Sequence, residues 1–205
     1  DDSGEALAMA MLAFGITDDI NTTNPEHVNA AKDKLNELID LVDVKVDITQ
    51  YETIANGKFN VHQAWSGDMI AARWYLASGI TLEDLGYWVP EDETQRVIGN
   101  DNIAIPKSAE SPVLAHTFLN YILDNEVSEK NFNWNGYQPP MNSMNPDSLI
   151  QADLGEYAPN TGPGTVPPSL DVAVVHPEVF DTGYWYLELP PEDDLKWQTA
   201  WQQVK

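Results

Sequence analysis

The feature of this sequence that most constrains its fold is the alternation of short apolar segments with longer amphipathic ones. Period-two or apolar patterns that predict strands occur at residues 44–49, 59–65, 84–90 and 96–106. Helical spacing of apolar residues occurs at residues 3–15, 23–42, 69–79, 111–132 and 191–205. Strands that alternate with helices predict an α/β fold with a largely parallel sheet.

Trp65 stands where one of these predicted strands passes through Ser66-Gly67-Asp68 into a helix. In open α/β sheets, ligands bind beyond the carboxyl ends of strands, at this kind of junction. An indole ring there could form a platform for a sugar face, a methylene chain or a cation. The alternative is that the ring is wedged between the helix and the sheet as part of the core.

The start of the chain, "DDSGE", also has two interpretations. Asp2 and Glu5 have the spacing of a capping box, in which each side chain satisfies a backbone N–H at the start of a helix. The same spacing places two carboxylates at one helix end, where they could receive an ammonium group. One residue could cap the helix while the other binds.

Two further positions are candidates for ligand contact. Asp101 directly precedes an apolar segment, where a carboxylate is either solvated, a cap or a ligand contact. Tyr137 lies in "WNGYQPPMNS", where glycine and proline restrict the backbone. Its ring is either a ligand contact or an anchor that packs the loop onto the rest of the protein.

The charge of the chain excludes some classes of partner. There are 33 acidic and 10 basic residues, for a net charge of −23, so nucleic acid and anionic membrane surfaces would be repelled. The excess charge either favours cationic ligands or keeps the surface solvated. Seven tryptophans, eight tyrosines and 42% hydrophobic residues indicate a globular protein, and no run is long enough to span a bilayer.

Signals for catalysis and for metal binding are weak. The four histidines lack metal-ligand spacing, and the absence of cysteine excludes thiolate chemistry. No nucleophile-elbow or P-loop motif occurs. A pair of carboxylates suited to glycoside hydrolysis remains an alternative, although no spacing singles one out. We therefore expect no enzyme activity, no cofactor and no metal.

Several segments, taken in order, resemble the spermidine/putrescine-binding proteins, the extracytoplasmic solute-binding components of polyamine ABC importers. The segments that carry the resemblance are "DDSGEALAMAMLAFG", "NTTNPEHVNAAKDKLNELI", "NGKFNVHQAWSGD", "NDNIAIPKSAESPVLAHTFLNYILDNEVS" and "NGYQPPMN". The resemblance covers residues 1 to about 145 and returns weakly in the last helix. It implies a type II periplasmic-binding-protein-like fold with two lobes that close on the solute.

The resemblance also implies which residues bind. In this family aromatic rings sandwich the methylene chain of the solute and carboxylates take its ammonium groups. The carboxylates fall on Asp2, Glu5 and Asp101, and the aromatic rings fall on Trp65 and Tyr137. The partners implied are a small cationic solute, such as spermidine or putrescine, and an ABC permease. The location implied is extracytoplasmic, in the periplasm or at the cell surface with a lipid anchor.

Two departures qualify this expectation. The family usually has a tryptophan two residues before the acid at position 101, and here that residue is Gly99. Family members also begin with a substantial lobe upstream of the "DD..E" helix, so we expect this chain to be a fragment. Residues 1–100 and 150–205 would then form the second lobe, and residues 101–149 would cross into the first.

That division has a consequence for the helix predicted within 111–132. It would lose packing partners for its apolar side chains, which include Leu114, Phe118, Tyr121 and Ile122. We expect this helix to leave an exposed apolar patch or to pack on a second chain by self-association. The function expected is thus solute binding for an ABC importer, and the alternative is a carbohydrate-binding or glycosidase-like domain that uses tryptophan platforms and carboxylates.

Overall fold

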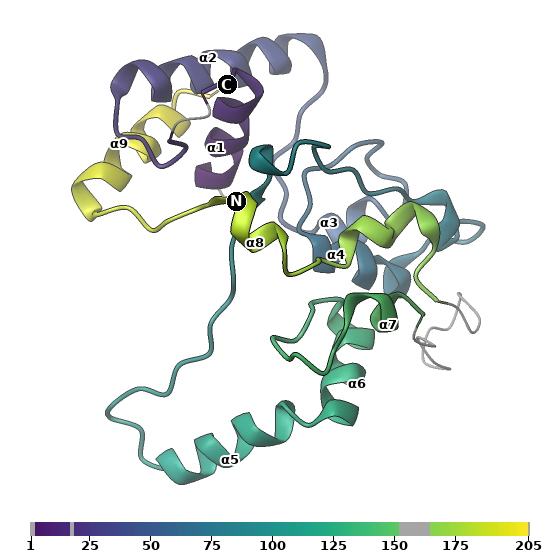
Figure 1. Ribbon diagram of the computed structural model, residues 1–205. Helices are drawn as coiled ribbons and strands as arrows, with labels where there is room; N and C mark the ends of the chain where they lie inside the picture. Colours follow the sequence, from purple (N-terminus) through teal and green to yellow (C-terminus); the bar gives the residue numbers. More distant parts are fainter. Residues whose placement is uncertain (1–2, 17–18, 152–164, 205) are drawn as a thin grey trace. The chain divides into compact units, whose positions relative to one another are not determined.

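The computed structural model describes residues 3–16, 19–151 and 165–204 of the 205-residue chain. Within them the chain is mixed α/β and mostly helical (Figure 1). The elements are, in order, α1 (Ser3–Ala13), α2 (Pro25–Leu41), α3 (Gln50–Thr53), α4 (Ser66–Ala71), the 3-10 helices η1 (Ala72–Tyr75), η2 (Leu82–Asp84) and η3 (Glu93–Gln95), β1 (Val97–Ile98), α5 (Pro112–Ile122), α6 (Asn125–Asn135), α7 (Pro146–Gln151), the 3-10 helix η4 (Pro168–Ala173), α8 (Val179–Thr182), β2 (Tyr184–Trp185) and α9 (Pro191–Trp201).

The chain divides into two compact units. The first unit consists of residues 1–48, 90–101 and 177–205, and the second consists of residues 49–89 and 102–176. The prediction that residues 101–149 belong to a different lobe of a longer protein stays a prediction.

The core of the first unit lies among α1, α2 and α9, which pack against one another (Figure 1). α1 is apolar on nearly every side and is therefore buried, with Leu7 and Met11 fully enclosed. Trp197 of α9 completes this core and donates its indole N–H to the Thr22 carbonyl at 2.9 Å. Gly15, the last residue of the helix predicted at 3–15, adopts a φ of +74° just after α1, a conformation typical of helix ends.

The described part of the chain has one pair of strands, and it lies in the first unit. β1 and β2 are parallel, with Val97 opposite Tyr184 and Ile98 opposite Trp185. The parallel direction agrees with the predicted fold class, although the sheet is much smaller than predicted. The contribution of residues 184–185 was not predicted from the sequence.

Three predicted strands, at residues 44–49, 59–65 and 84–90, are wrong. A strand exists only where a second strand supplies hydrogen-bond partners, and an apolar pattern does not supply one. The segment at 59–65 is instead anchored through a side chain, because the Tyr87 hydroxyl donates to the Ala64 carbonyl at 3.0 Å.

The long helix predicted at 111–132 is two helices. α5 ends at Ile122, and Asp124 begins α6 by accepting hydrogen bonds from the backbone N–H groups of Glu126 and Val127. A side chain that caps a helix in this way competes with continuation of the preceding helix, so the chain turns at this residue.

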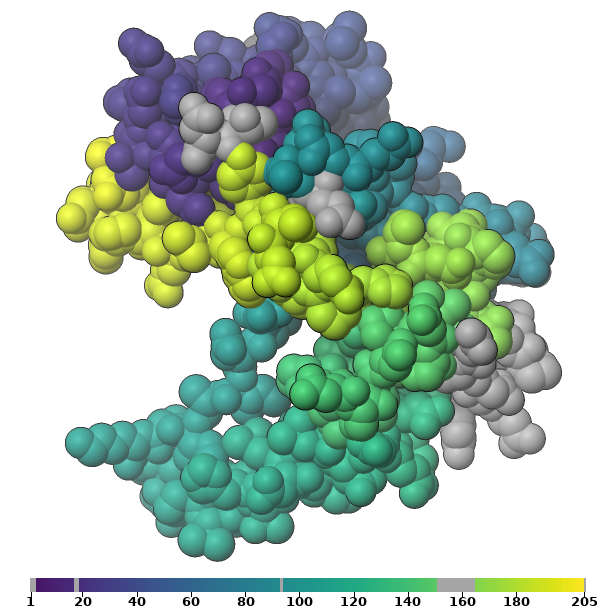
Figure 2. Space-filling view, in the orientation of Figure 1, coloured from purple at the N-terminus to yellow at the C-terminus, as the bar shows by residue number. Residues whose placement is uncertain are grey.

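α4 is the central element of the second unit, with α3, α6, η1 and η4 packed around it. The core of this unit includes Met69, Ile70, Phe132, Leu149 and Leu170. α5 is different, because none of its side chains is buried. Figure 2 shows the surface of this segment, coloured teal, uncovered on the visible face. The exposed apolar patch expected for this helix is therefore present.

Candidate functional site

Trp65 lies at the N-terminal end of α4, in the second unit. Its backbone is extended, with φ −70° and ψ 149°, and α4 begins at the next residue. The side chain is 38% exposed. The predicted strand is absent, but the position ahead of a helix is as predicted, and the indole is neither fully buried nor fully in solvent.

Tyr137 reaches the same helix start from the end of α6. Gly136 ends α6 in the left-handed conformation, with φ +76°, and the Tyr137 N–H then donates to Asn135 Oδ1 at 2.8 Å. The ring of Tyr137 lies against Gly67, where a Cβ atom would come within 2.5 Å of the ring. Its hydroxyl donates to Asp68 Oδ1 at 2.7 Å, and the side chain remains 38% exposed.

The contact between the two helix ends depends on two glycines. A Cβ atom at Gly136 would lie 1.9 Å from the carbonyl oxygen of Gly67, so the backbones approach too closely for any side chain. This close approach holds Trp65 and Tyr137 at one end of α4. The structure therefore places both predicted residues at the N-terminal end of α4, within one unit.

Asp68, which the sequence analysis did not select as a site residue, is 6% exposed. Burial raises the pKa of its carboxyl above the ordinary value of 3.8, although hydrogen bonds from Tyr137 and Gln50 and the electrostatic interaction with His62 act in the opposite direction. At a pH below the ordinary pKa of 3.8, the carboxyl is neutral in both the folded and the unfolded chain. As the pH rises through the folded-state pKa, its ionisation lowers the stability of the fold.

Arg73 is a second buried charged residue that the sequence analysis did not select. It is 2% exposed, and burial lowers the pKa of its guanidinium to about 10. Its Nε donates to the Ile70 carbonyl at 3.0 Å, while its Nη2 has no hydrogen-bond partner in the part of the chain that the structure describes. The contact with a carbonyl near the end of α4 indicates a structural role.

Of the predicted carboxylates, the two that the structure describes belong to the first unit. Glu5 is half-buried in the first turn of α1, and Asp101 is exposed beyond the end of β1. Asp2 lies outside the described residues, so its predicted pairing with Glu5 stays a prediction.

At Gly99, a Cβ atom would meet no other atom within 4 Å. The position is therefore open to a larger side chain.

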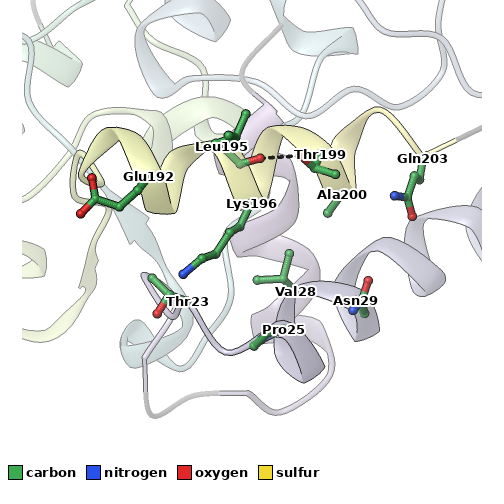
Figure 3. A pocket seen from close by; sticks show the side chains of 10 residues that line it. All are labelled: Thr23, Pro25, Val28, Asn29, Glu192, Leu195, Lys196, Thr199, Ala200 and Gln203. Atoms are coloured by element: carbon green, nitrogen blue, oxygen red, sulfur yellow. Dashed lines mark hydrogen bonds between the residues drawn. The ribbon is translucent and has the colours of Figure 1, made fainter.

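A separate hollow in the first unit lies between the start of α2 and the face of α9 (Figure 3). Val28 and Lys196 line it, together with Thr199, whose hydroxyl donates to the Leu195 carbonyl at 2.7 Å. Of the predicted site residues that the structure describes, none lines this hollow. We interpret it as a groove between packed helices.

The described ranges contain neither a candidate metal site nor a helix that could span a membrane. No group of three histidine and carboxylate side chains there could hold a metal ion. No helix within those ranges has the length and apolar character needed to cross a membrane.

Residues 1–156 match a protein family described as "Bacterial extracellular solute-binding protein". The chain belongs to this family. Its type II periplasmic binding fold is the fold class predicted from the sequence. No solved structure matches the chain.

Two similar proteins have names that fit this family. The "Spermidine/putrescine-binding periplasmic protein" of Salmonella typhimurium is 27% identical over 140 residues, which are 68% of this chain and 37% of that protein. The protein of the same name from Escherichia coli is 26% identical over a region that covers the same shares of the two chains. The matched region thus spans little more than a third of these relatives.

Proposed function

We propose that this chain is part of an extracytoplasmic solute-binding protein of an ABC importer, and that its solute is a small cation such as spermidine or putrescine. The observation that carries the proposal is the placement of two half-exposed aromatic rings, Trp65 and Tyr137, at one end of α4. The names of the relatives support the class of solute.

The residues have complementary roles in this proposal. Trp65 and Tyr137 contact the methylene chain and provide electron-rich faces for a cation. The carboxylates that the resemblance assigns to the ammonium groups, Glu5, Asp101 and Asp2, stay a prediction from the sequence. Binding is the whole of the chemistry, and the protein has no catalytic role. The closed, solute-bound protein then docks on a membrane permease.

A panel of solutes tests this function. The full-length product of the gene is heated with spermidine, putrescine, a neutral diol of the same chain length and a hexose. At about 100 times the Kd, a polyamine is expected to raise Tm by roughly 3 °C. Stabilisation by the hexose alone would overturn the proposal in favour of a carbohydrate-binding protein.

Gly99→Trp is expected to strengthen polyamine binding. The resemblance places a tryptophan at this position, the space beside Gly99 is open, and its backbone does not adopt a positive φ. An added ring supplies about 1 kcal/mol of cation–π energy, or roughly fivefold in Kd, measured by calorimetry. Gly86→Trp is the control, since Gly86 is also free of neighbours within 4 Å. Equal affinities for the two variants and the parent protein would contradict the assignment.

We also propose that the exposed face of α5 associates with a second copy of this chain. Leu114, Phe118 and Tyr121 share one face of the helix, and Phe118 is 57% exposed. The net charge of −23 opposes association, so dimers are expected to increase with salt in sedimentation velocity. Phe118→Asp is expected to give monomers, whereas His116→Asp, on the opposite face, leaves the dimer intact. A monomer at all salt concentrations would refute this.

A further inference from the structure

Arg73 is the one basic side chain that is buried among the bases that the structure describes. It lies in η1, next to the core residues Ile70 and Ala72, and is 2% exposed. Long basic side chains near a core usually extend their charged end into water, and this one does not. A cation withdrawn from water opposes folding unless an opposite charge takes the place of the water.

The described part of the chain provides no opposite charge for Arg73. None of the ion pairs there includes it, and burial is the only effect that shifts the pKa of its guanidinium. The helices α3 and α4 pack against η1. Their acids are Glu52, which is exposed, and Asp68, which is hydrogen-bonded to Tyr137. Since its pKa is about 10, Arg73 remains charged at pH 7.

The hydrogen bonds of Arg73 are also incomplete. A guanidinium has five N–H donors in a planar fork. Nε donates to the Ile70 carbonyl at 3.0 Å, while Nη2 is enclosed and finds no partner among the described residues. A carboxylate accepts two such donors at once and also neutralises the charge, which a neutral acceptor cannot do. The chemistry of the unpaired group therefore fits a carboxylate.

The rest of the full-length protein is the source that the observations favour. The matched region is 37% of the Salmonella typhimurium relative, so a protein of that length has a large part outside this chain. A carboxylate fixed in the same folded protein has a high effective concentration beside Arg73. A free anion would have to give up its own water for a single cation.

We propose that Arg73 pairs with an aspartate or glutamate of the full-length protein that lies outside residues 1–205, and that this ion pair fastens the second unit to the rest of the protein. The inference does not depend on the identity of the solute. It is therefore tested separately from the proposed function.

The test uses the full-length protein without solute. Arg73→Met keeps much of the volume of the side chain but removes its charge. If Arg73 is paired, the variant leaves a carboxylate without its opposite charge, and Tm at pH 7 is expected to fall by about 4 °C. Removal of an unpaired buried cation has the opposite sign. A Tm that rises or stays the same would overturn the inference.

The loss of Tm is also expected to depend on pH. Pairing lowers the pKa of the partner carboxyl in the folded protein, so its stabilisation is present above the ordinary value of about 4 and is lost as the pH falls through the folded-state pKa. The difference in Tm between the parent and Arg73→Met should therefore shrink from about pH 5 downward. The Ile70 hydrogen bond does not titrate in this range, so a constant difference would contradict an ion pair.

Double variants locate the partner. Each acid of the full-length protein is replaced by its amide, alone and together with Arg73→Met. We expect one acid outside residues 1–205 whose replacement lowers Tm in the parent but not in Arg73→Met. Such coupling to an acid within residues 1–205, or a rise in Tm with sodium sulfate that is larger in the parent than in Arg73→Met, would refute the proposed source.

Arg73→Lys replaces Arg73→Met in these double variants if the latter does not fold. It keeps the cation but loses the planar fork, so replacement of the partner acid should lower Tm by less than in the parent. Equal losses of Tm in the parent and in Arg73→Lys for every acid outside residues 1–205 would count against the pair.

Discussion

Gly136→Ala is expected to destabilise the second unit by at least about 3 kcal/mol. An alanine there must adopt a φ of +76°, and its Cβ would come within 1.9 Å of the Gly67 carbonyl oxygen and 2.9 Å of the Ala71 nitrogen. Both atoms belong to the backbone, so no side-chain rotation relieves the overlap, and α4 must separate from the end of α6. Urea unfolding at equilibrium measures the effect.

Gly79→Ala is the matched control for this substitution. Gly79 also has a positive φ, of +89°, but a Cβ atom there would meet nothing within 4 Å. Its substitution therefore adds only the backbone strain, about 1 to 2 kcal/mol. Equal losses of stability in the two variants would show that α4 and α6 do not approach each other as the structure indicates.

Trp65→Ala is expected to weaken binding of putrescine and spermidine by about 2 kcal/mol, or roughly 30-fold in Kd. The substitution removes the larger of the two aromatic faces beside α4, along with its contact with the methylene chain and its cation–π interaction. Because the indole is 38% exposed, the loss of stability should be smaller than for a tryptophan of the core. Calorimetry on the full-length protein measures the affinity.

Two variants make this result specific. Trp65→Phe retains an aromatic face and is expected to recover part of the affinity. Trp88→Ala removes a tryptophan of the second unit that is 77% exposed, and is expected to leave the Kd unchanged. If Trp88→Ala weakens binding as much as Trp65→Ala does, the solute does not bind at the start of α4.

The elements that were predicted correctly are those with local signals. The helix at α2 begins with Asn24 as its cap and Pro25 in its first turn, and the end of α1 is marked by Gly15. Such signals act within a few residues and can be read directly from the sequence. The strands could not be predicted in the same way, because a strand depends on a distant partner.

The candidate site shows the same limit. Trp65 and Tyr137 were selected individually, from a helix start and from a rigid turn. Their common position depends on the close approach of Gly67 and Gly136, which are 69 positions apart. Asp68 was quoted only as part of a turn, since its burial is a tertiary effect. Arg73 had a weak signal, as an isolated cation in the apolar segment "MIAARWYL".

The most direct test of the account is a calorimetric titration of the full-length gene product with putrescine and spermidine, with a hexose as the neutral control. The account predicts saturable binding of at least one polyamine, at micromolar or tighter Kd, and no heat from the hexose. Saturable binding of the hexose and none of either polyamine would contradict it, and would leave the family assignment without a cationic solute.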